Sequence, residues 1–200
     1  MQWRPEREKP IKFRLKNMKV GILPVGQVAS DVFMELEQGL VKIFPDTVCQ
    51  ILKEALPIPQ QAFDKKRKQY NSSLILNEIC GFATKNGHFH RVLGVVDVDV
   101  FASGLNYVFG EAYVSGKAGL ISLWRLKPDF YGENSSSQSL FLRTIKEAVH
   151  ELGHTLGLQH CHRSLCVMHF SNSIFDTDEK QSLFCGQCYL QAALAINRLG

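Results

Sequence analysis

Apolar side chains recur at helical spacing in four parts of the chain. The first stripe predicts a helix over 31–44 with Ser30 or Asp31 as its N-cap, and it consists of Val32, Phe33, Leu36, Leu40 and Ile43. Further helices are expected at 71–84, 136–157 and 186–198.

Shorter apolar runs between these helices predict strands. They lie at 18–26, within 46–56, at 89–101, at 107–114 and at 118–126. The last two flank Ser115-Gly116-Lys117, a sequence typical of a hairpin turn. The stretches 57–70 and 161–184 are expected to be an exposed loop and an irregular segment. Mixed helices and strands with an antiparallel hairpin predict an α+β fold.

Composition and charge narrow the protein class. The 200 residues are 45% hydrophobic and 21% charged, which favours a folded domain over a disordered chain. No stretch approaches the roughly 18 apolar residues of a membrane span. Residues 1–17 hold six basic and two acidic side chains, so they carry the whole net charge of +4. We therefore expect no nucleic-acid partner and no membrane partner.

This charge distribution divides the chain into a basic N-terminal extension, 1–17, and a single domain, 18–200. The extension has an alternative interpretation as a strand, because Ile11, Phe13 and Leu15 alternate with basic residues. It lacks the apolar stretch of a secretion signal, so a cytoplasmic location is expected. The sequence carries no information on oligomeric state, and a monomer is assumed.

The strongest chemical feature is His-Glu-Leu-Gly-His-Thr-Leu-Gly-Leu-Gln-His at 150–160. His150 and His154 lie about 40° apart around a helix, so both imidazoles can point at one ion. Gly157 permits the left-handed conformation that ends a helix, which allows His160 to turn back toward them. Three neutral imidazoles leave Zn²⁺ one open position for water. Glu151 is placed beside that water as a general base and later a proton donor.

The six cysteines fall into two groups. Cys49 and Cys80 stand alone in apolar contexts and are expected to be core residues. Four others form two close pairs: Cys161, Cys166, Cys185 and Cys188. Four thiolates at this spacing suit a closed, structural Zn²⁺ site, which gives two zinc ions per chain. Disulfides, a redox pair or free thiols are the alternatives.

The residues that follow the histidine motif resemble one family. The spacing C-x4-C-x-M over Cys161, Cys166 and Met168, followed by Cys185-Gly-Gln-Cys188, is similar to the archaemetzincin family of the metzincin clan. Sixteen residues separate Met168 from Cys185, about one fewer than in the family. A loop can absorb that difference.

This resemblance implies a compact metzincin-like zinc peptidase domain over 18–200. It would contain a mixed twisted sheet, an active-site helix and a C-terminal helix, and it would hydrolyse a peptide or protein substrate. Met168 would be the Met-turn residue below the metal ligands, although ordinary core packing explains it equally well. By the same resemblance, 107–114 would be an edge strand that pairs with extended substrate, with Gly110 allowing close approach.

Several choices stay open at this point. Phe170 stands where some metzincins have a tyrosine, so no phenol is expected to assist catalysis from that position. A zinc-binding adaptor that captures peptide segments without cleaving them is therefore an alternative function. Glu111 and Glu147 are expected to be solvated, and Asp97 and Asp99 to make polar contacts on the sheet face or in a turn.

Overall fold

The computed structural model describes residues 17–44 and 46–199. Most of the expected extension, residues 1–16, lies outside the described part of the chain. Five helices longer than one turn are described there: α1 (Asp31–Ile43), α2 (Ser72–Lys85), α3 (Ser137–Thr155), α4 (Ile174–Glu179) and α5 (Gly186–Asn197). No described helix is both long and apolar enough to span a bilayer.

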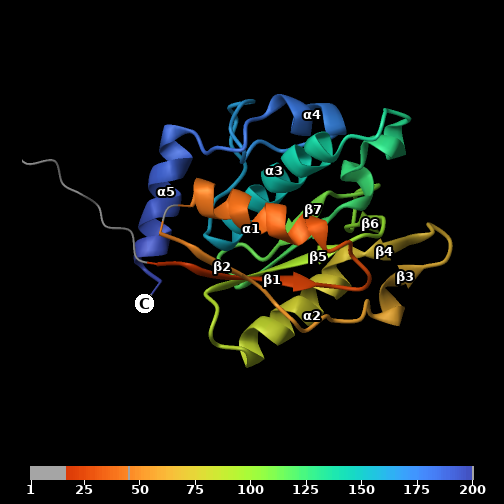
Figure 1. Ribbon diagram of the computed structural model, residues 1–200, viewed down its shortest axis with the longest axis horizontal. Helices are drawn as coiled ribbons and strands as arrows, with labels where there is room; N and C mark the ends of the chain where they lie inside the picture. Colours follow the sequence, from red (N-terminus) through yellow and green to blue (C-terminus); the bar gives the residue numbers. More distant parts are fainter. Residues whose placement is uncertain (1–16, 45, 200) are drawn as a thin grey trace, which may run out of the picture.

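A five-stranded sheet forms the centre of the molecule, in the order β2-β1-β5-β8-β7 (Figure 1). Its strands are β1 (Lys19–Pro24), β2 (Val48–Ile51), β5 (Arg91–Val96), β7 (Gly110–Ala112) and β8 (Ala118–Ser122). All neighbours are parallel except β7 and β8, which form the predicted hairpin. The expected mixed sheet is confirmed, and β7 lies at one of its edges.

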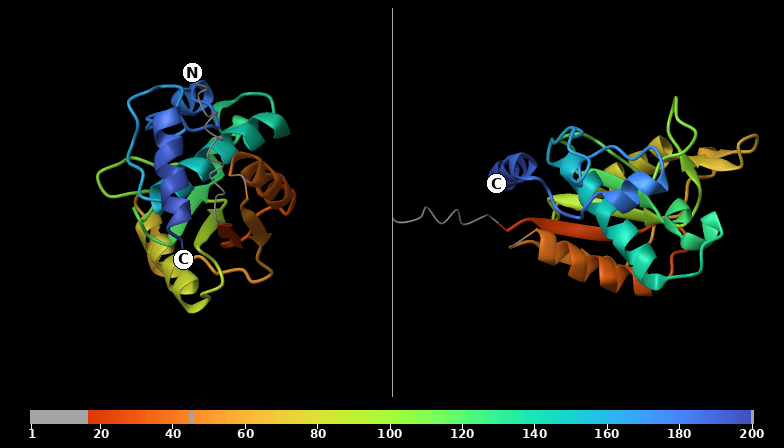
Figure 2. Two further views of the ribbon diagram at one scale, coloured as in Figure 1. Left: turned by 90° about the vertical axis from the view of Figure 1, so that its left-hand side faces the viewer. Right: turned by 90° about the horizontal axis from the view of Figure 1, so that it is seen from above.

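Helices cover both faces of this sheet. Val20 and Ile22 of β1 face a core shared with α1, α3 and α5, whereas Leu23 faces a second core shared with α2. The views in Figure 2 and Figure 1 show α2 on the opposite side of the sheet from α1 and α3. The helix that carries the histidine motif therefore packs directly on the sheet, close to the β7 edge.

Helix α3 begins and ends where the sequence indicates. The Ser136 hydroxyl accepts a hydrogen bond from the Ser139 N–H at 3.2 Å, which caps the first turn. At the other end Gly157 has a φ of +94°, and the Leu158 N–H donates to the Gly153 carbonyl. Both features are typical of a Schellman-type end, which reverses the chain just before His160.

The segment 57–70 is not a loop, contrary to expectation. It contains a 3-10 turn (Gln60–Ala62) and a hairpin of β3 (Phe63–Asp64) and β4 (Gln69–Asn71), which forms a small second sheet with β6 (Val100–Phe101). The Asp64 carboxylate accepts from the N–H groups of Lys66 and Arg67, and the Phe63 and Tyr70 rings pack against each other in a tilted arrangement with their centroids 4.9 Å apart. The basic cluster is the exposed turn of this hairpin.

Other predicted boundaries were too long. The run 89–101 forms two strands, and β8 gives way to 3-10 turns at Trp124–Leu126 and Pro128–Tyr131. The run 107–114 contributes only the three residues of β7. Helix α4 lies inside the segment expected to be irregular, and Ser173 and Asp176 form a capping box at its start. That Ser-x-x-Asp spacing was visible in the sequence.

Candidate active site and metal centres

The three motif histidines converge at the end of α3. The Nε2 atoms of His150 and His154 lie 3.0 Å apart, and a nitrogen of His160 lies within 4.8 Å of both. The Nδ1 atoms of His150 and His154 lie 2.7 and 2.8 Å from the carbonyl oxygens of Val167 and Leu158. These contacts orient each Nε2 toward the common centre, as supporting groups do for metal ligands.

The donor set fits one Zn²⁺. Zn–N bonds of 2.0–2.1 Å in a tetrahedral site separate the nitrogens by about 3.4 Å, which the histidine cluster nearly provides. Burial lowers the pKa of His150 well below 6.5 and also lowers the pKa of His154 and His160. The imidazoles are therefore neutral at pH 7, as metal ligation requires.

Glu151 is buried against the edge of the sheet, with 4% of its surface exposed. A Cβ atom on Gly110 of β7 would stand 2.5 Å from Oε1 of Glu151, so only glycine leaves room for the carboxylate. A Cβ atom on Gly119 of β8 would stand 3.4 Å from Cβ of Glu151, which is an ordinary packing distance. Burial raises the pKa of Glu151 well above 4.5, and the nearby Glu147 carboxyl raises it further.

Glu147 is buried rather than solvated, contrary to expectation. Only 3% of its surface is exposed, and its Oε1 accepts from Nζ of Lys180 at 2.9 Å and from the Thr177 hydroxyl at 3.0 Å. Lys180 is itself 1% exposed. A fully buried lysine is rare unless it is paired. This ion pair ties the end of α4 to the middle of α3, and nothing in the sequence around Lys180 distinguished it.

Met168 is the residue for which the sequence predicts a Met-turn role. Its side chain is fully buried and lies against Gly153 of α3, where a Cβ atom would collide with its sulfur. The Met168 carbonyl accepts from the Cys161 N–H at 2.9 Å. The methionine therefore packs between the active-site helix and the cysteine cluster.

The four clustered cysteines meet as predicted. Their sulfurs lie within 4.8 Å of one another, and Cys161 and Cys185 are 3.9 Å apart. Zn–S bonds of 2.3 Å in a tetrahedron give an edge of about 3.8 Å, so the cluster fits a closed zinc site. A hydrogen bond from the Cys188 N–H lowers the pKa of the Cys185 thiol to about 6, while burial raises the pKa of Cys166 and Cys188. All four are free thiols, not disulfides.

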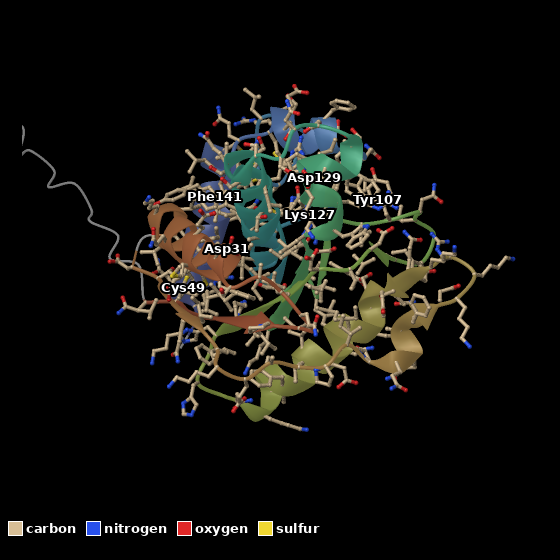
Figure 3. All side chains as sticks on the ribbon, turned by 45° about the vertical axis from the view of Figure 1, so that its right-hand side comes forward. Asp31, Cys49, Tyr107, Lys127, Asp129 and Phe141 are labelled. Atoms are coloured by element: carbon tan, nitrogen blue, oxygen red, sulfur yellow. The ribbon has the colours of Figure 1, made fainter. Side chains whose placement is uncertain are left out.

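Other polar residues singled out in the sequence have structural contacts. Glu111 is half-buried rather than fully solvated, and its carboxylate accepts from the Ser72 and Ser73 hydroxyls at the start of α2. Asp99 pairs with Arg125 at 2.6 Å, and Asp97 pairs with Lys127 at 2.7 Å. Figure 3 labels Lys127 together with Tyr107, which precedes β7, and Cys49, which is buried as expected.

Comparison with known proteins identifies the family. Residues 32–193 match the sequence model of peptidase family M54. The chain belongs to this family. An archaemetzincin of Methanocaldococcus jannaschii is 43% identical over 171 residues, which cover 86% of this chain and 90% of that protein. An archaemetzincin of Pyrococcus abyssi is 40% identical over 170 residues, covering 84% of this chain and 90% of that protein.

Solved structures of the family share this fold. The archaemetzincin of Archaeoglobus fulgidus, complexed with malonate, matches with a TM-score of 0.75 and 37% identity over 87% of this chain and 99% of that one. The Methanopyrus kandleri archaemetzincin matches with a TM-score of 0.79 and 30% identity over 94% and 99%. The M54 chain described here is therefore a zinc metallopeptidase that acts on a peptide or protein substrate.

Proposed function

We propose that this M54 peptidase hydrolyses peptide bonds with Glu151 as its general base. In this proposal His150, His154 and His160 hold a catalytic Zn²⁺. The observation that carries it is the position of Glu151, which is buried between the histidine cluster and the β7 edge against Gly110.

The residues divide the chemistry between them. When bound, Zn²⁺ lowers the pKa of a coordinated water and polarises the scissile carbonyl. Glu151 takes a proton from the attacking water and then delivers it to the leaving amine. The free edge of β7 holds the extended substrate by main-chain hydrogen bonds, largely regardless of its sequence. Met168 supports the floor of the site.

We also propose that Cys161, Cys166, Cys185 and Cys188 hold a second, structural Zn²⁺. The supporting observation is the close approach of four sulfurs from two distant parts of the chain. Such a site fixes the segment that contains Met168 to the start of α5. A cytoplasmic location, a monomeric state and the lack of a nucleic-acid partner stay predictions from the sequence.

Metal analysis tests the ligand assignment. The wild type is expected to contain two zinc ions per chain, and His154→Ala and Cys185→Ser are each expected to lose one. His88→Ala and Cys80→Ser, which change the same residue types outside both clusters, should keep two. A single zinc in the wild type would contradict the two-site proposal.

Cleavage of a diverse peptide library tests the role of Glu151. Glu151→Ala should retain both zinc ions and lose turnover. Equal cleavage by wild type and variant would show that hydrolysis comes from elsewhere.

The adaptor hypothesis predicts peptide binding without turnover in fully zinc-loaded wild type. Phe170 favours the adaptor hypothesis, because it stands where some metzincins have a tyrosine and so offers no phenol to assist catalysis. The centroid of its ring lies 4.9 Å from that of His160.

A further inference from the structure

Two cavities border the histidine cluster. One is small and lies between the segment Tyr107–Gly110 and α3, where His150 and Glu151 line it. The other is a groove of about 510 Å³ between the segment 156–162 and α5, where His160 lines it. We call the second the α5 groove. Its α5 wall is formed by Gln187, Gln191, Leu194 and Arg198 among others.

Strand β7 leads from one cavity toward the other. Gly110 lies against Glu151, which lines the small cavity. Ser115, just beyond the strand, donates its N–H to the His154 carbonyl at 3.0 Å and lies against Gly157, which lines the α5 groove. A peptide paired along this edge therefore passes the metal ligands and has one end at each cavity.

The direction of that peptide decides which end occupies the groove. Antiparallel pairs are slightly more stable per residue than parallel ones, and β7 is already in the antiparallel part of the sheet. An antiparallel peptide runs from the Ser115 end of β7 toward Gly110. Its residues before the scissile bond then lie at the α5 groove, and those after it lie at the small cavity.

The charges that line the α5 groove indicate which type of substrate side chain it would accept. None of the described residues that line it is acidic, and Arg198 is the only one with a permanent positive charge. Within 17–44 and 46–199 the Arg198 guanidinium forms no ion pair. The neutral amides of Gln159, Gln187 and Gln191 and the His162 ring line the same space. Cys161 and Cys188 also line the groove, and with the proposed structural Zn²⁺ their four-thiolate centre would carry a net charge of −2. Arg198 is therefore the group of the lining that would attract a carboxylate.

We propose that the α5 groove binds substrate residues before the scissile bond and selects an acidic side chain among them through Arg198. The volume of the groove lies in the range of pockets that bind small ligands. This inference rests on the proposed function and deepens it, because it names a substrate preference for the same site.

A matched peptide series tests this preference. Each peptide carries a single Glu, Gln or Lys at one of the four positions before the scissile bond. At one position Glu is expected to raise kcat/KM over Gln by about 3- to 10-fold, the effect of a single charge-assisted contact, and to act mainly through KM. Lys at that position should lower kcat/KM below Gln.

Variants then assign the preference to Arg198. Arg198→Ala should remove the difference in kcat/KM between Glu and Gln peptides, and Arg198→Glu should reverse it in favour of Lys. Lys85→Glu is the matched control, because it makes the same charge change on α2, across the sheet from the groove. A merely structural role for Arg198 would lower all rates together without reversing the order.

The outcomes separate the two proposals. If the wild type cleaves neutral peptides and the Arg198 variants keep its order of preference, the groove proposal is overturned and the hydrolytic one stands. If the wild type cleaves nothing, the hydrolytic proposal fails. The groove is then judged by fluorescence anisotropy of the labelled peptides on zinc-loaded Glu151→Ala protein. Equal affinities for Glu and Lys peptides would overturn it there as well.

Discussion

Gly110 of β7 and Glu151 of α3 are packed so closely that a Cβ on the glycine would stand 2.5 Å from the carboxylate oxygen and 2.7 Å from Cγ. The same Cβ would stand 2.7 Å from the Leu120 carbonyl oxygen in the neighbouring strand. Backbone lies on one side of this Cβ position and the proposed base on the other. A side chain at position 110 would therefore displace either strand β8 or the Glu151 carboxylate.

Gly110→Ala is therefore expected to lower kcat/KM by about 100-fold, since a displacement near 1 Å at a reacting group has an effect of that order. Zinc content should stay at the wild-type value, because no proposed ligand is on β7. Kinetics with metal analysis check both expectations. Gly81→Ala is the control, because its Cβ would meet nothing within 4 Å. Wild-type activity in Gly110→Ala would contradict the assigned position of Glu151.

Gly157 is expected to control zinc binding through its backbone. Its φ of +94° is unfavourable for alanine, and its Cβ would lie 2.9 Å from the Ser115 hydroxyl. Gly157→Ala should lower stability by about 1–3 kcal/mol and weaken zinc binding at the histidine site, because His160 shifts with the turn. Gly132→Ala, with a φ of +72° and open space around it, should lower stability without changing zinc affinity. Competition with a chelator measures that affinity, and equal affinities in the two variants would count against the prediction.

Lys180→Met is expected to destabilise the zinc-loaded protein by about 3–5 kcal/mol, because it leaves the Glu147 carboxylate buried without its cation. The double variant Lys180→Met/Glu147→Leu should recover most of this loss, since two buried apolar side chains leave no charge without a partner. Urea unfolding measures both. Lys42→Met, an exposed lysine on α1, should change stability by less than about 0.5 kcal/mol. A double variant no more stable than Lys180→Met would contradict the ion-pair explanation.

The pH dependence of the metal-free protein follows from the buried imidazole of His150. Its pKa is lowered well below 6.5 by burial, so the unfolded chain binds a proton there before the folded chain does. The stability contributed by neutral His150 is present above pH 6.5 and is lost as the pH falls below it. Glu151, whose pKa is raised, makes stability change with pH in the opposite direction. Two proteins that both keep Glu151 and differ only at position 150 therefore show the contribution of the histidine alone.

His150→Gln provides that comparison. The wild type should lose free energy of unfolding relative to the variant as the pH falls from 7.5 to 5, because glutamine does not titrate. Denaturant unfolding of both metal-free proteins at several pH values gives the difference. A difference that stays constant over this range would show that the burial of His150 does not control its protonation.

Much of the fold was visible in the pattern of apolar positions. The helices α1, α2, α3 and α5 were predicted to within one or two residues, because each buries apolar residues in one of the two cores. The hairpin β3–β4 was missed, since its stability comes from local contacts such as Asp64 with its turn and from pairing with the distant β6. Helix α4 was not predicted, although the sequence contains the Ser173-x-x-Asp176 spacing of its capping box.

The sequence by itself determined which side chains gather at the end of α3, since His150, Glu151 and His154 share one helix and Gly157 ends it within reach of His160. Helical geometry fixes such neighbours wherever the helix lies. The tertiary structure alone decided which residues surround them. Gly110 against Glu151, Lys180 against Glu147 and the groove beside Arg198 join segments far apart in the chain. Those pairings depend on how helices and strands pack together, which no local pattern of side chains specifies.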